Sequence, residues 1–140
     1  MYTVQRVRLG GPNFEATTAM GSKLYWERMV DASQAVNIVF IVQGQLSVPV
    51  TLQTVGSETD SPRDRHTHFS IGPSPRTNLP SGAFRKALTL NLQEDWFPYI
   101  GIVATLADGL VSSPEAYGSL GRITITALVR ELVLGSNSRA

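Results

Sequence analysis

The 140-residue chain has no cysteine, few charged residues, and only two lysines beside ten arginines. Without cysteine it cannot form a disulfide framework, use a thiol in catalysis, or hold zinc or an iron–sulfur cluster through thiolates. Charged residues make up 16 % of the chain, against roughly a quarter in an average soluble domain. The formal net charge of +1 does not by itself attract nucleic acid. We therefore expect a surface covered by neutral polar groups or by a partner, and the excess of arginine favours planar contacts at interfaces or to phosphate.

Long apolar runs and internal repeats are also missing. The longest apolar run, residues 36–42, is much shorter than the ~18 residues of a membrane-spanning helix. The first residues, MYTVQRVRLGG, lack the architecture of a signal peptide. We expect a single domain over residues 1–140 with no membrane partner.

Alternating or β-branched runs predict strands along most of the chain. They cover residues 3–9, 14–20, 24–30, 36–42, 46–55, 84–92, 99–107 and 122–134, with a shorter run at 66–71. Within residues 101–134, two segments also fit a helical period, but Gly101, Gly109 and the β-branched ITIT run favour strands. Gly44 predicts a bulge or bend. Eight or nine strands separated by turn signals predict an all-β, antiparallel jelly roll or β-sandwich.

Residues 56–82 form the longest stretch without a clear strand pattern. The stretch is rich in proline and polar residues, and loops of this length usually carry function or contact partners. We expect the arginines of this stretch to make interface contacts, together with the aromatic turn that follows the predicted strand at residues 84–92. These candidates are Arg63, Arg65, Arg76, Trp96, Phe97 and Tyr99.

Both histidines lie in this proline-rich stretch. On a strand, Asp64, His66 and His68 share one face, and a carboxylate with two imidazoles can ligate a metal. Cupin jelly rolls use such a His-x-His pair followed soon by a glutamate, but here the sequence continues FSIG. A polar strand edge is therefore favoured over a metal site, and we expect no cofactor.

Motifs for catalysis are absent. The chain has neither a Gly-x-Ser-x-Gly elbow nor a glycine-rich phosphate loop with lysine. Glu58, Asp60 and Asp64 alternate with arginines, which is typical of a solvated or interface loop rather than of a tuned acid–base pair; a calcium site is the alternative. We expect no catalytic residue and no enzymatic activity.

Positive charge is mildly concentrated near the N-terminus, at Arg6, Arg8, Lys23 and Arg28. Two interpretations remain open, namely phosphate contacts on one surface or an ordinary solvated strand edge.

Several short stretches occur in a familiar order. They are VFIVQG at 39–44 with SVP at 47–49, DWF at 95–97, ADGLVS at 107–112 and ITIT at 123–126. Over residues 16–134 this order resembles the small jelly-roll coat proteins of plant satellite viruses, of the satellite panicum mosaic virus type. The resemblance implies that many copies of an eight-stranded jelly roll close into an icosahedral shell around RNA in a virion. The RNA-facing candidates are then Arg6, Arg8, Lys23 and Arg28.

One feature departs from that family. Such coat proteins usually begin with an arginine- and lysine-rich arm that neutralises RNA, whereas this sequence starts almost directly at a predicted strand. Two alternatives stay open. One is a single-stranded RNA phage coat protein, with a sheet followed by C-terminal helices, and the other is a non-viral carbohydrate-binding sandwich that uses Trp96. The predicted function is a self-assembling structural coat protein.

Overall fold

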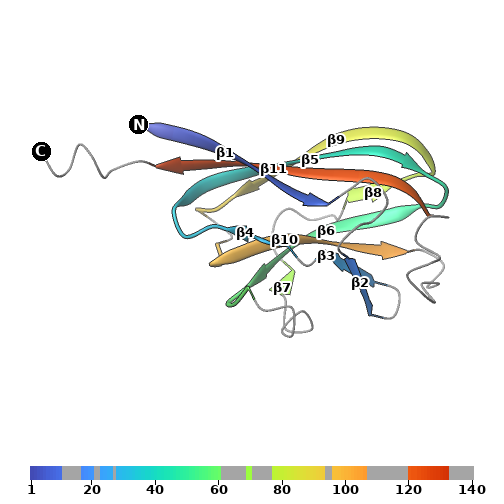
Figure 1. Cartoon of the computed structure of the whole chain (residues 1–140), viewed down its shortest axis with the longest axis horizontal. Helices are drawn as coiled ribbons and strands as arrows, with labels where there is room; N and C mark the ends of the chain where they lie inside the picture. The colour runs from blue at the N-terminus through green and yellow to red at the C-terminus, as the bar shows by residue number, and fades with distance from the viewer. Residues whose placement is uncertain are drawn as a thin grey trace, which may run out of the picture.

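The computed structural model describes residues 1–10, 17–20, 23–26, 28–60, 69–70, 77–93, 96–106 and 120–132, with the backbone alone at 17–20 and 69–70. These residues form two antiparallel sheets stacked as two layers (Figure 1), so the predicted all-β sandwich is confirmed. The strands are β1 (Tyr2–Gly10), β2 (Thr17–Met20), β3 (Lys23–Trp26), β4 (Val30–Asp31), β5 (Ala35–Leu46), β6 (Val50–Ser57), β7 (Phe69–Ser70), β8 (Thr77–Leu79), β9 (Gly82–Asn91), β10 (Tyr99–Leu106) and β11 (Gly121–Leu132).

The strand order is that of a jelly roll. The first sheet has the order β1-β11-β5-β9, and the second has β2-β3-β10-β6-β7 with β4 on β10 and β8 on β6. Partners are nested along the chain, because β1 pairs with β11, β3 with β10, β5 with β9, and β6 with β8. A double sheet wound in this way from its outermost to its innermost strands is a jelly roll. The short strands β2, β4 and β7 lie beside this nested set, which explains why the strands outnumber the eight or nine predicted.

One hydrophobic core fills the space between the sheets. In β11 the buried residues are Ile123, Ile125, Ala127 and Val129, so the predicted alternation directs every second side chain inward. β5 alternates in the same way between Ile38 and Val42, whereas β6 and β10 also bury residues of their other face, such as Val55 and Val103. The largest fully buried side chains are Phe40, Ile38, Leu90, Ile123 and Ile125 in the first sheet and Leu24, Leu52, Ile100 and Ile102 in the second.

The prediction of one strand at residues 46–55 is wrong. β5 ends at Leu46 and β6 begins at Val50, with a bend between them. The Ser47 N–H donates to the carbonyl oxygen of Leu120 at 2.9 Å, and Pro49 has no N–H for a ladder. Leu46 and Val50 are both buried, so the alternation continues across the bend and conceals it.

The helical alternative for residues 101–134 is also wrong wherever the structure describes them. Both described segments, β10 and β11, are strands. β11 pairs with β1 on one side and β5 on the other, and this position suits its β-branched residues. The C-terminal helices of the phage-coat alternative are therefore not found in the described part of this region.

Gly44 does not form the expected bulge. The β5 register runs without a break through Gly44 toward both β11 and β9. A Cβ atom at this position would collide with the carbonyl oxygen of Arg122. Glycine is therefore required here by the close approach of β11, not by a bend.

Candidate nucleic-acid interface

Five arginines share the outer face of the first sheet. Arg122 and Arg130 are exposed on β11 and alternate with its buried residues. Directly opposed residues of neighbouring antiparallel strands lie on the same side of a sheet. Arg6 faces Leu128 and Arg8 faces Thr126, which are outward positions of β11, and Arg85 faces the outward Gln43 of β5. We call this surface, with Arg6, Arg8, Arg85, Arg122 and Arg130, the arginine face.

Among the described residues, the arginine face contains no carboxylate. Register assigns these further residues to it: Tyr2, Val4, Asn37, Val39, Ile41, Gln43, Gln45, Ala83, Ala87, Thr89, Asn91, Thr124, Thr126 and Leu128. Among the residues that the structure describes, none of the five arginines has an ion-pair partner. A face with several exposed guanidinium groups and no neutralising carboxylate attracts anions, phosphate above all.

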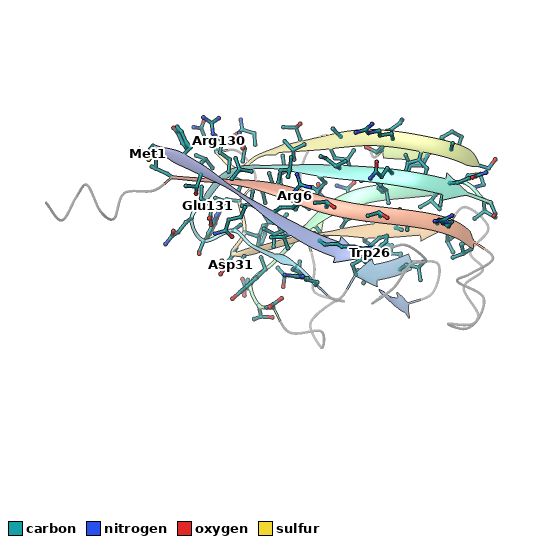
Figure 2. The ribbon with its side chains drawn as sticks, turned by 45° about the horizontal axis from the view of Figure 1, so that its top comes forward. Met1, Arg6, Trp26, Asp31, Arg130 and Glu131 are labelled. Carbon is teal, nitrogen blue, oxygen red and sulfur yellow. The ribbon has the colours of Figure 1, made fainter. Side chains whose placement is uncertain are left out.

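The described carboxylates lie elsewhere. Glu131 alternates with Arg130 and so takes the opposite side of β11, while Asp31 belongs to β4 in the second sheet. Figure 2 shows Arg130 above the first sheet and Asp31 below it. Glu58 and Asp60 follow the end of β6. Burial, and next the nearby Asp31 carboxylate, raise the pKa of Asp60 above its usual value of 3.8.

A polar hollow of about 380 Å³ lies at one end of the arginine face. It is lined by Tyr2, Val36, Asn37, Thr89, Asn91, Gln93 and Arg130. The Arg130 guanidinium lies over the Tyr2 ring, 4.0 Å from its centroid, so a cation–π contact orients both groups. The Asn91 side-chain oxygen accepts the Gln93 N–H at 3.0 Å, which leaves the side-chain NH₂ of Asn91 available as a donor.

A second hollow, of about 280 Å³, lies at the other end of the face. It is lined by Gln43, Gly44, Gln45, Ala83, Arg122, Ile123 and Thr124. Both hollows combine one arginine with side-chain amides: Arg130 with Asn37, Asn91 and Gln93 in the first, and Arg122 with Gln43 and Gln45 in the second.

Only some of the RNA-facing residues predicted from the sequence lie on the arginine face. Arg6 and Arg8 lie on the arginine face, and exposed Arg28 reaches the same strand because its Nη1 donates to the Arg8 carbonyl oxygen at 3.3 Å. Lys23 lies on β3 in the second sheet. Sequence reasoning missed Arg85, Arg122 and Arg130. The sequence pattern could have identified them, because each occupies an outward position on a strand whose apolar residues point inward.

The aromatic candidates gather on the second sheet. Trp96 is 48 % exposed, and its Nε1–H donates to the Ala32 carbonyl oxygen at 2.9 Å. The Ala32 N–H donates in turn to the carbonyl oxygen of Pro98 at 2.8 Å. Trp96 therefore helps to stabilise the turn that precedes β10. Phe97 packs against Gly56, and half-buried Tyr99 lies between Asp31 and Ser57.

The remaining candidates, Arg63, Asp64, Arg65, His66, His68 and Arg76, lie outside the described residues. Within the described ranges, no group of three His, Cys, Asp or Glu side chains could hold a metal ion. The same part of the chain contains no helix long and apolar enough to cross a membrane.

Comparisons of the chain with protein-family models, with curated proteins and with solved structures found no match. The class of protein is therefore defined by the strand pairing and the surface alone. It is an all-β jelly roll in which one sheet carries an arginine face without a carboxylate among the described residues.

Proposed function

We propose that the protein is a structural coat protein whose copies assemble into a shell that encloses RNA in a virion. The observation that carries this proposal is the arginine face, the outer face of the first sheet, where the described residues include five exposed arginines and no carboxylate. The jelly-roll topology supports it by fold-level analogy, since capsid domains are one of the uses of this fold. The resemblance in motif order to satellite-virus coat proteins points the same way.

The arginine face answers the objection raised by the low net charge. Phosphate contacts depend on the charge that a protein presents locally to the nucleic acid, not on its total charge. The chain has a net charge of +1, yet the described carboxylates lie away from the arginine face. In the proposed shell the face therefore contributes to neutralising RNA, a role that a basic N-terminal arm usually has in the coat proteins that the chain resembles.

The exposed edge of β1 is a candidate contact between copies. β1 and β9 are the two edge strands of the first sheet. On β9, Lys86 pairs with the buried Val42 and so points to the inner side, and an inward lysine of this kind discourages edge-to-edge pairing. β1 has no inward-pointing charged residue of this kind. Its residues 2–6 are all exposed, and the exposed fractions of Tyr2 and Val4 are 50 % and 64 %.

A two-fold axis at Val4 gives this edge a favourable partner register. Antiparallel pairing of two β1 strands about that axis sets Val4 against its own copy, and Tyr2 against Arg6 of the second copy. No like charges then face each other, and tyrosine against arginine is an attractive pair. Because the axis is perpendicular to the sheet, both arginine faces remain on one side and form one continuous basic surface.

The proposal is tested by expressing the protein with RNA and following assembly by light scattering and negative-stain microscopy. We expect closed particles that protect RNA from nuclease. Gln5→Lys gives β1 an inward-pointing lysine like Lys86 of β9. We expect it to raise the protein concentration needed for assembly at least about tenfold, because it buries a charge at the contact. Ser81→Lys adds the same charge in an exposed turn and is the matched control, expected to assemble normally.

A protein that stays monomeric at every salt concentration and pH, with or without RNA, contradicts the coat-protein proposal. Equal assembly of Gln5→Lys and Ser81→Lys contradicts only the β1 contact.

A further inference from the structure

We infer that the hollow formed by Asn37, Asn91 and Arg130 is a base-binding subsite for single-stranded RNA. The inference rests on the proposed function, because it assumes that RNA lies on the arginine face, and it adds what the RNA presents there: unpaired bases as well as phosphates.

The first support is the alignment of these side chains. Arg130 pairs with Asn37, and Asn37 pairs with Asn91, on three successive strands. Neighbouring strands lie about 4.8 Å apart, so the guanidinium and the two amides form a short row across the sheet. The hollow of about 380 Å³ is near the lower end of the range for one small-molecule site, roughly 300–1,000 Å³. It suits a single nucleotide, not a folded segment.

The second support is the chemistry of the row. A side-chain amide offers one acceptor and two donor hydrogens and can pair with the edge of a base. Guanidinium planes are among the groups on which unpaired bases stack. Arg130 is already held over Tyr2, at 4.0 Å from the ring centroid, and Asn91 is oriented by the Gln93 N–H. Both groups are thus ordered before a ligand arrives, which lowers the entropy cost of binding.

The third support is the repetition of this chemistry at the opposite end of the face. Gln43, Gln45 and Arg122 line the second hollow. Asn37 and Gln43 are six positions apart on β5, which corresponds to about 20 Å of extended strand. An extended single strand running along β5 and β11 passes both hollows, with Arg6 and Arg8 between them and Arg85 beside the second hollow for its phosphates.

A duplex does not fit this arrangement. Paired bases turn their Watson–Crick edges to each other, and the deep, narrow major groove of A-form RNA hides further edges from side chains. The wide, shallow minor groove of a duplex presents other base edges and 2′-hydroxyls, but the Watson–Crick edges are open to the row of amides only in unpaired bases.

Fluorescence anisotropy at fixed salt tests the subsite with three labelled probes of equal length: single-stranded RNA, the same backbone with abasic sites, and an RNA duplex. We expect single-stranded RNA to bind about tenfold more tightly than the abasic strand. In the double variant Asn37→Ala, Asn91→Ala this preference is reduced severalfold, because the second hollow and Arg130 remain, while the affinity for the abasic strand is unchanged. Asn78→Ala, an exposed asparagine on β8 of the second sheet, is the matched control and keeps the preference.

The outcomes separate the two proposals. If neither single-stranded probe binds, the RNA-enclosing function fails. If the normal and abasic strands bind equally, or the duplex binds as well as the single strand, phosphate binding stands and the base subsite is overturned. A preference that is unchanged in the double variant also overturns it.

Discussion

The two sheets of this jelly roll differ in the charge that they expose. In the part of the chain that the structure describes, the outer face of the first sheet carries five arginines and no carboxylate. Three of the four described carboxylates, Asp31, Glu58 and Asp60, lie on or directly after strands of the second sheet. The net charge of +1 is a sum over the whole chain and does not show that these arginines and carboxylates lie on different surfaces. A small total charge is compatible with a strongly basic surface when the fold sorts the charged residues between its layers.

The sheets also differ in the surroundings of one strand glycine each, Gly44 in the first sheet and Gly101 in the second. Substitution of Gly44 by alanine is the change with the largest expected effect. A Cβ at Gly44 in the first sheet meets the backbone of Arg122, whereas at Gly101 in the second sheet it meets the flexible side chain of Met29 at 3.2 Å. We expect Gly44→Ala to reduce the free energy of unfolding by at least about 2 kcal/mol, as overpacking against rigid groups does, and Gly101→Ala to cost less than about 1 kcal/mol. Denaturant titration measures both, and equal losses would refute the account of the close approach at Gly44.

The charge difference is tested next by removing one positive charge from each sheet. Arg6→Gln acts on the arginine face and Lys23→Gln on β3, where both wild-type side chains are exposed. A phosphate contact to single-stranded nucleic acid contributes about 0.7 to the slope of log affinity against log salt. We expect Arg6→Gln to weaken RNA binding severalfold and to reduce that slope by about 0.7, with no change for Lys23→Gln. The reverse result would assign RNA to the second sheet.

The smallest expected effect concerns the carboxylates of the second sheet. The pKa of Asp60 is raised by burial and then by Asp31, so the native state binds this proton more tightly than the unfolded state does. Ionised Asp60 therefore lowers stability above its folded pKa, and this loss disappears as the pH falls below the usual value of 3.8. We expect Asp60→Asn to raise the unfolding midpoint slightly at neutral pH and to have no effect below pH 3.8. Glu58→Gln serves as the control, and a stabilisation by Asp60→Asn that persists in acid would exclude this cause.

Much of the fold could be predicted from the sequence, because the long strands alternate apolar and polar residues. Residues 122–134 show this well, since β11 buries every second side chain between Ile123 and Val129. The bend between Leu46 and Val50 was missed because the alternation continues through it. Pairing partners were not predictable, since the jelly roll joins strands as distant as β1 and β11.

The arginine face was predictable only in part for the same reason. Arg6 and Arg8 are two residues apart on one strand, so their shared side is visible in the sequence. Arg85, Arg122 and Arg130 join them only through the registers of β9, β5 and β11. The hollow around Asn37 likewise depends on residues from all four strands of the first sheet or the turn beyond them, and no local spacing reveals such a set.

Ultraviolet cross-linking of the protein to RNA, followed by mass spectrometry of the linked peptides, tests the central claim most directly. The chain has an aromatic reporter on each side, because Tyr2 lies on the arginine face whereas Tyr25, Trp96 and Tyr99 belong to the second sheet or the turn before β10. We expect the RNA cross-links at Tyr2 and in peptides from β1 and β11. Cross-links confined to Tyr25, Trp96 or Tyr99 would contradict the assignment of RNA to the arginine face.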